Sequence, residues 1–162
     1  SISAENTLPI GLAKNTITGG QINYTGETNS YMFSGSYQTA FKLTNVSVNA
    51  LNATLVFYGD GRTRHSVIDC ELRNIVISQI NGAASSINDI ARIQGNSFYF
   101  DDKFTASSPL ISESGTLHAI LSDNILFDAT TDQKIVLPAE TVTFNYTGMG
   151  NTVIKTTGMT ML

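Results

Sequence analysis

The sequence has few of the residues that mark several large protein classes. It contains a single cysteine, Cys70, no tryptophan and only 14% charged residues in a chain of 162. One cysteine cannot form an internal disulfide, so the fold must depend on its core or on oligomerisation, and it tolerates a reducing compartment. No segment approaches the roughly 18 uninterrupted apolar residues that a membrane-spanning helix requires. We therefore expect no membrane partner.

The charge balance and the motif inventory exclude further functions. The chain has 13 acidic and 9 basic residues and a net charge of -4, which gives nucleic acid no general electrostatic attraction. It has no cysteine pair, no His-Glu-x-x-His, no Walker loop and no Gly-x-Ser-x-Gly. We expect no nucleic-acid partner, no metal site and no conventional multi-turnover enzyme.

What is present indicates an all-β domain. Hydrophobic residues make up 41% of the chain, enough for one packed core, and Asn, Gln, Ser and Thr supply 55 residues. Short runs of Val, Ile, Phe, Tyr and Thr alternate with clusters of Gly, Asn, Asp and Ser, which is typical of strands joined by turns. Strands are predicted near residues 16–24, 31–34, 40–48, 53–58, 66–72, 74–80, 97–100, 116–121, 124–128, 134–137, 141–146 and 152–156.

Two architectures fit this rhythm. Pairs of residues that tolerate positive φ favour hairpins, and hence an antiparallel, jelly-roll-like β-sandwich. These pairs are Gly19–Gly20, Asp60–Gly61, Asn81–Gly82 and Asp123–Asn124. The alternative is a short right-handed parallel β-helix, because asparagines recur before apolar runs with gaps of 30, 29, 22, 28 and 27 residues. They are Asn15, Asn45, Asn74, Asn96, Asn124 and Asn151.

Two short helical segments are also expected. Residues 1–6 can form a helical turn before Pro9, and residues 86–93 begin with a capping pair, Ser86 and Asp89, and continue with helical spacing. The resulting organisation is an N-terminal arm at residues 1–14 and a β-sandwich domain at residues 15–162.

The densest basic cluster is a candidate anion site. Arg62, Arg64 and His65 follow directly after the glycine-containing segment 59–61. Two guanidinium groups and an imidazole beside accessible backbone amides can hold a phosphate, a carboxylate or a nucleotide. The alternative is a hairpin with solvated arginines. The nearby carboxylates Asp69 and Glu71 are interpreted as an exposed polar face at strand spacing.

The first residues suggest self-cleavage. The chain begins with Ser1 rather than Met, as a processed chain would, and Glu5 follows four positions later. On one helical turn the Glu5 carboxylate can accept a proton from the Ser1 hydroxyl, which can attack the carbonyl of the preceding residue and give an ester that hydrolyses. The alternative is an ordinary helix cap or an arbitrary boundary.

The Ser1 start, Glu5 and the β domain rich in Asn, Thr and Ser resemble the C-terminal maturation domain of the preneck appendage, or tail spike, of small Bacillus podophages. The resemblance implies an intramolecular chaperone that forms a homotrimer with the N-terminal remainder of the spike attached. It implies a single autoproteolytic cut before Ser1, assisted by Glu5, and nucleotide-dependent release, with ATP as cofactor. The domain would act in the host cytoplasm and be absent from the mature virion.

Two other classes of function stay open. A receptor- or glycan-binding head of a viral fibre would also be β-rich, but it would remain on the virion tail. An enzyme acting on carbohydrate is disfavoured because the sequence places no spaced carboxylate pair.

Overall fold

The computed structural model describes residues 2–4, 8–10, 14–25, 30–35, 40–59, 65–81, 90–105, 111–114, 117–132, 144–147 and 149–155, and within them the regular elements are all strands. Those of the first half are β1 (Ile2–Ala4), β2 (Leu8–Ile10), β3 (Lys14–Thr18), β4 (Gln21–Tyr24), β5 (Ser30–Gly35), β6 (Ala40–Thr44), β7 (Ser47–Gly59) and β8 (Ser66–Ile68). Those of the second half are β9 (Glu71–Asn81), β10 (Ile90–Gln94), β11 (Ser97–Phe100), β12 (Ile111–Ser114), β13 (Leu117–Ser122), β14 (Ile125–Asp128), β15 (Phe144–Thr147) and β16 (Thr152–Lys155). No helix that could cross a membrane occurs in this described part of the chain.

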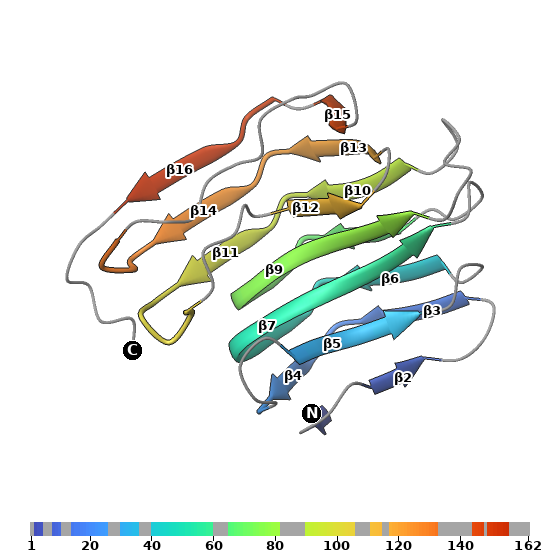
Figure 1. Ribbon diagram of the computed structural model, residues 1–162, viewed down its shortest axis with the longest axis horizontal. Coiled ribbons are helices and arrows are strands. Elements are labelled where there is room, and N and C mark those ends of the chain that lie inside the picture. The colour runs from blue at the N-terminus through green and yellow to red at the C-terminus, as the bar shows by residue number, and fades with distance from the viewer. Residues whose placement is uncertain are drawn as a thin grey trace.

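The described strands form two parallel sheets through which the chain passes in successive coils (Figure 1). Sheet A has the order β1-β4-β7-β9-β11-β14-β16, with β2, β5 and β12 beside it, and sheet B has the order β15-β13-β10-β8-β6-β3. After β1 and β2, each coil crosses sheet B and then sheet A. We number the coils 1 to 6, at residues 14–35, 40–59, 66–81, 90–114, 117–128 and 144–155.

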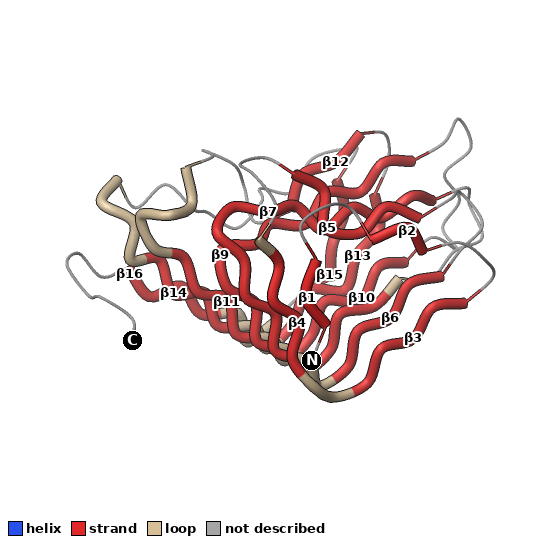
Figure 2. Tube along the Cα trace, turned by 90° about the horizontal axis from the view of Figure 1, so that it is seen from below, coloured by secondary structure: helices blue, strands red, loops and turns tan. Residues whose placement is uncertain are grey.

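The two sheets meet along one corner, which Figure 2 shows at the bottom of the molecule. A residue with a positive φ turns each coil from sheet B to sheet A; in coils 1 to 6 it is Gly19, Asn45, Asp69, Gly95, Asp123 and Gly150, and in coil 1 Gly20 has a positive φ as well. The corner N–H donates to the next coil: Asp69 N to Gln94 O at 3.0 Å and Gly95 N to Ser122 O at 3.1 Å. The corner therefore continues the hydrogen-bonding pattern of the sheets, so buried backbone groups remain paired.

The core lies between the two sheets and is built from residues stacked in register. In sheet A, Ile22, Val48, Leu72, Phe98 and Leu126 occupy equivalent positions on successive coils, and each is at most 1% exposed. In sheet B, Leu43, Val67, Ile93 and Leu121 form the facing stack and are fully buried. Alternation along each strand places the intervening side chains outside.

The expected antiparallel, jelly-roll-like β-sandwich is wrong, because both sheets are parallel throughout the described residues. Gly19–Gly20 and Asp123–Asn124 turn the chain from one sheet to the other, so the strands on either side pair with neighbouring coils and not with each other. Positive-φ residues serve both kinds of turn, which is why they did not separate the two architectures. The alternative, a parallel β-helix, is compatible with this pairing.

Both expected helices are also wrong in their described residues. Ile2–Ala4 forms β1, which pairs with β4, and Ile90–Gln94 forms β10, which pairs with β8 and β13. Pairing on both edges of β10 outweighs a short helical pattern, because intrinsic propensity is weak compared with tertiary contacts. Residues 82–89, and so the capping pair, lie outside the described residues.

Candidate functional site

The structure describes one of the five residues predicted to act in cleavage or nucleotide binding. Ser1, Glu5, Arg62 and Arg64 lie outside the described residues. His65 precedes β8, is 3% exposed, and its backbone oxygen accepts a hydrogen bond from Arg92 N at 2.9 Å. His65 is therefore buried, and its backbone pairs with coil 4.

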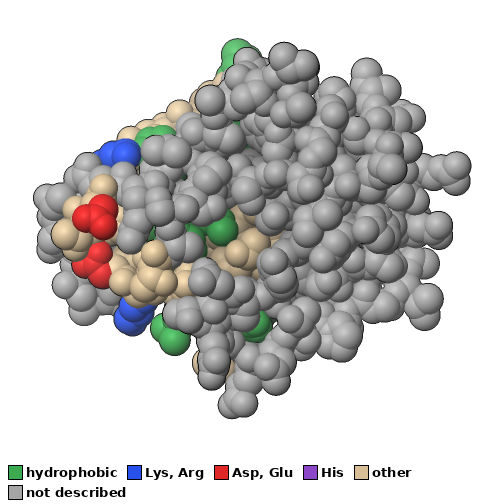
Figure 3. All heavy atoms as spheres, in the orientation of Figure 1, with side chains coloured by type: hydrophobic (Ala, Val, Ile, Leu, Met, Phe, Trp, Pro, Cys, Tyr) green, Lys and Arg blue, Asp and Glu red, His purple; other side chains and the backbone are tan. Residues whose placement is uncertain are grey.

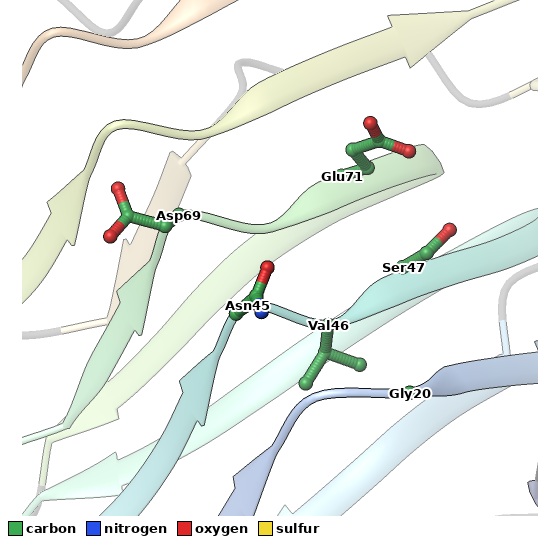
Figure 4. Close-up of a pocket in the computed structure, with 6 residues that line it drawn as sticks. All are labelled: Gly20, Asn45, Val46, Ser47, Asp69 and Glu71. Atoms are coloured by element: carbon green, nitrogen blue, oxygen red, sulfur yellow. The ribbon is translucent and has the colours of Figure 1, made fainter.

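An open pocket lies at the corner on coils 1 to 3 (Figure 4). It has a volume of about 360 Å³ and is lined by Gly20, Asn45, Val46, Ser47, Asp69 and Glu71. In Figure 4 the Asp69 and Glu71 carboxylates come from coil 3, while Asn45 and Ser47 lie on coil 2. The two carboxylates are exposed, in agreement with the predicted polar face. An oxygen-lined pocket of this kind accepts hydrogen bonds and suits a cationic or hydroxyl-bearing group.

An asparagine ladder fills the corner from coil 4 to coil 6. Asn96, Asn124 and Asn151 each follow the bend residue, and their amides link consecutive coils. The Asn124 side-chain oxygen accepts from Asn96 N at 3.1 Å and from Asn96 Nδ2 at 3.0 Å. The Asn124 amide donates to Ile93 O at 2.8 Å and to Asn151 Oδ1 at 2.9 Å. These buried amides have partners for both donor and acceptor, so the ladder stabilises the corner.

The sequence did not predict this ladder. The recurring asparagines were selected because Asn tolerates the left-handed region at a bend, and only Asn45 among those at this corner has a positive φ; Asn96, Asn124 and Asn151 follow the bend residue, and Asn15 lies within β3. Asn74 has a φ of 55° at a different bend, inside β9, where its amide donates to Asp101 Oδ1 at 3.0 Å. The missed signal is the residue pair: a Gly or Asp before Asn marks the ladder, whereas Asn45 precedes Val46.

Cys70 takes the asparagine position on coil 3. Its N–H donates to Asn96 Oδ1 at 2.9 Å, and its thiol donates to Ile68 O at 3.2 Å. Burial raises the pKa of the Cys70 thiol above its ordinary value of 9.0, and backbone hydrogen bonds, first that of Val46, act in the opposite direction. A buried thiol that stays protonated is a poor nucleophile, so Cys70 is structural.

The outward face of the first part of sheet A carries two rows of side chains that run along the axis of the coils. Register assigns row 1 as Gln21, Ser47, Glu71, Ser97, Ile125 and Thr152, and row 2 as Asn23, Asn49, Arg73, Tyr99, Phe127 and Ile154. Coils 1 and 2 are polar in both rows, coil 3 carries opposite charges, and coils 5 and 6 are mainly apolar. Ile125 is 38% exposed and Ile154 is 36% exposed.

Row 2 contains a continuous stack. The Arg73 guanidinium lies 6.0 Å from the centroid of the Tyr99 ring, and Tyr99 stacks on Phe127 with centroids 4.9 Å apart and an interplanar angle of 3°. A guanidinium over an aromatic face and parallel rings are both favourable contacts. Because the rings cover each other's faces, their edges point away from the sheet.

Asp101 and Asp102 lie in the loop after β11, and Asp132 lies in the loop after β14. Thr131 donates to Asp102 Oδ1 through its N–H at 2.7 Å and through its hydroxyl at 3.0 Å. Figure 3 shows acidic side chains at the left edge of the molecule, where these loops lie in Figure 1. Among the described residues, no group of three or more His, Cys, Asp or Glu side chains is placed to hold a metal ion.

No family model, curated protein or solved structure matches the chain.

Proposed function

We propose that the chain is a trimerising maturation domain of a phage tail spike, which promotes assembly of the spike and then leaves it. The observation that supports association is the exposed aliphatic surface of coils 5 and 6. Ile125, Val153 and Ile154 are each between 36% and 38% exposed, although Val153 belongs to the inward row of sheet A. Adjacent exposed aliphatic side chains favour burial against another chain.

The parallel coils give an assembly role a physical reason. Every coil pairs with residues of the next coil, as Ser97 does with Ile125, so the sheets consist of non-local contacts. Such folds form slowly because loops must close before the contacts form. Holding three chains together raises their effective concentration and brings the segments to be paired into register.

Sedimentation velocity at micromolar concentration tests the association. A homotrimer is expected, and a stable monomer would exclude an assembly function of this kind.

Autocleavage before Ser1 is the proposed route by which the domain separates from the N-terminal remainder of the spike. In an uncut precursor, Ser1→Ala should abolish cleavage because the attacking hydroxyl is lost, and Glu5→Gln should slow it because an amide cannot take the proton. Ser3→Ala is the matched control, since it removes a nearby hydroxyl and should leave cleavage unchanged. Normal processing of both Ser1→Ala and Glu5→Gln, followed by intact mass, would exclude this mechanism.

Nucleotide-dependent release is the remaining part of the proposal. Arg62 and Arg64, next to His65, are the proposed ATP phosphate ligands, because arginine forms bidentate charge-assisted hydrogen bonds with phosphate. Calorimetric titration should detect ATP binding that weakens with salt and disappears in Arg62→Ala/Arg64→Ala, while Arg92→Ala retains it. The release step acts in the host cytoplasm, so virions should lack the domain.

A glycan-binding head of the virion tail is a second candidate, favoured by the corner pocket. A pocket of about 360 Å³ lined by Asn45, Ser47, Asp69 and Glu71 offers several acceptors for sugar hydroxyls and lies within the usual size range of small-ligand sites. Presence of the domain on purified virions and binding to host cell-wall oligosaccharides, lost in Asp69→Ala, would support this function over the first.

A further inference from the structure

Each coil presents two outward positions at the same height on the axis of the coils, one in row 1 and one in row 2. On coil 3 they are Glu71, which is exposed, and Arg73, whose guanidinium extends over Tyr99 of the next coil. In the part of the chain that the structure describes, neither Glu71 nor Arg73 forms an ion pair. Two opposite charges thus lie side by side on one face, and both are available to form ion pairs with another molecule.

We propose that rows 1 and 2 form an interface with a second copy of this chain, in which Arg73 of one copy enters the acidic corner pocket of its neighbour at Asp69 and Glu71. This assignment rests on the proposed self-association and specifies its surface. The copies are related by rotation about an axis parallel to the axis of the coils, so that row 2 of one copy faces row 1 of the next.

This symmetry matches the chemistry of the face on coils 2, 3 and 5, whereas coil 4 brings Ser97 to Tyr99 and coil 6 brings Thr152 to Ile154. Rotation about a parallel axis keeps each coil level with the same coil of the neighbour. Coil 2 then brings Ser47 to Asn49, coil 3 brings Glu71 to Arg73, and coil 5 brings Ile125 to Phe127. Polar residues meet polar residues, opposite charges meet, and apolar residues meet apolar residues.

The geometry of Arg73 suits it to the pocket. The contact with Tyr99 holds the guanidinium at 6.0 Å from the ring centroid and restrains the long side chain before association. The edge of the guanidinium plane carries the donors that bind carboxylates in a bidentate manner. Asp69 and Glu71 line an open pocket of about 360 Å³, which can admit a side chain, and in Figure 4 their carboxylates point in different directions, so the Glu71 carboxylate is the one placed on the outward face for Arg73.

Charge reversal on either side tests the interface. Arg73→Glu and Glu71→Arg should each weaken self-association at least about tenfold in Kd, because like charges then face each other across every interface. Sedimentation velocity over a concentration series measures the change, and circular dichroism checks the fold. Arg92→Glu is the control, since it makes the same charge change at an exposed residue of sheet B and should leave association unchanged.

Mixing the two single variants gives the decisive result. Each contact between unlike variants pairs opposite charges again, and a mixed trimer contains two such contacts among its three, so differently tagged Arg73→Glu and Glu71→Arg chains should co-purify more strongly than either variant associates with itself. A pairing within one chain could not produce this rescue. If Arg73→Glu disturbs folding through Tyr99, Arg73→Gln and Glu71→Arg still test the two sides.

The outcomes distinguish a failure of this interface from a failure of the proposed assembly function. A monomeric wild-type protein would overturn both the proposed function and this interface. A wild-type oligomer that survives Arg73→Glu and Glu71→Arg, or variants that dissociate but do not recombine on mixing, would overturn this interface and leave the assembly function in place.

Discussion

The two halves of the sheet corner are stabilised by different chemistry. The inward corner position holds Asn96, Asn124 and Asn151 on coils 4 to 6, whereas coils 2 and 3 have Val46 and Cys70 there. Both sets are largely buried, and both follow a residue in the left-handed region. The corner geometry is thus the same while the side chain beneath it changes from an amide to an apolar group or a thiol.

The difference teaches how a side chain can join coils. An asparagine amide accepts from one coil and donates to another, as Asn124 does between Asn96 on coil 4 and Asn151 on coil 6, so it adds directional bonds. Val46 contributes only apolar burial. Cys70 is intermediate, because its thiol donates to Ile68 and lies within reach of the Val46 N–H.

Removing the central amide of the ladder, that of Asn124, should cause the largest loss of stability among changes at the corner. Asn124→Ala removes the buried hydrogen bonds that Asn124 makes with the Asn96 N–H, the Asn96 amide and the Ile93 carbonyl, and the Asn96 amide keeps only its bond to Val67 O. We expect the free energy of unfolding to fall by about 3 kcal/mol, measured by urea denaturation. Asn49→Ala, which breaks one 3.3 Å bond to Asn23 on the outward face, should cost less than about 1 kcal/mol. Equal losses would mean that the ladder adds nothing special.

A second test concerns the bend residue that precedes the ladder. Gly95 has a φ of 67°, and a Cβ there would collide with the Asp69 carboxylate of the neighbouring coil, whereas Gly19, with a φ of 71°, has open space. Gly19→Ala should cost about 1 kcal/mol from backbone strain alone, and Gly95→Ala less than about 1 kcal/mol more, because the exposed Asp69 carboxylate can turn away from the new Cβ. Thermal unfolding gives both values. The excess should shrink in an Asp69→Ala background, and its persistence there would refute the collision.

The pH dependence of stability should reveal the ionisation of the Cys70 thiol, which occupies the asparagine position on coil 3. Because burial raises the pKa of Cys70, the folded thiol stays protonated at pH values where the unfolded thiol ionises. Its contribution to stability is therefore intact below the ordinary value of 9.0 and is lost as pH rises above it, at up to about 1.4 kcal/mol per pH unit. Urea unfolding of wild type and Cys70→Ala at about pH 8 and about pH 10 isolates this loss. Parallel curves for the two proteins would contradict it.

The smallest effect is expected when the ladder is extended by one coil. In Cys70→Asn the new amide can accept from Val46 N–H and donate toward Leu43 O, the sheet B position equivalent to Val67 and Ile93. Unfolding free energy should stay within about 1 kcal/mol of wild type. Leu72→Asn, two positions later in the core, has no such partners and should prevent stable folding. A similar loss in both variants would show that coil 3 cannot hold an amide.

Local sequence patterns predicted several strands but not their neighbours. The run Ser97–Phe100 was expected as a strand and forms β11, because its aromatic residues alternate between core and surface. The same residues could not reveal that Glu71 and Ile125 are their partners in register. A segment such as Ile90–Gln94 was taken for part of a helix because its partners β8 and β13 are remote in sequence.

In the candidate site, too, local features could be predicted from the sequence, whereas contacts between coils could not. Asp69 and Glu71 were identified as exposed carboxylates from their spacing, and the repeat selected six asparagines without separating the three of the ladder from the others. The pocket was not predicted, because Gly20, Ser47 and Asp69 come from three different coils. The opposed rows of polar, charged and apolar residues likewise exist only once the coils are aligned.

The sequence by itself determined that this protein is β-rich, that its strands alternate between buried and exposed side chains, and that its turns use Gly, Asn and Asp at positive φ. These are local properties, set by side-chain sterics and by a period of two residues along a strand. Only the tertiary structure decided that the strands run parallel, that Asn124 bonds to Asn96 and Asn151, and that Arg73 lies beside Tyr99. Those contacts join residues on different coils, and their register is selected by the burial of all coils together rather than by any single segment.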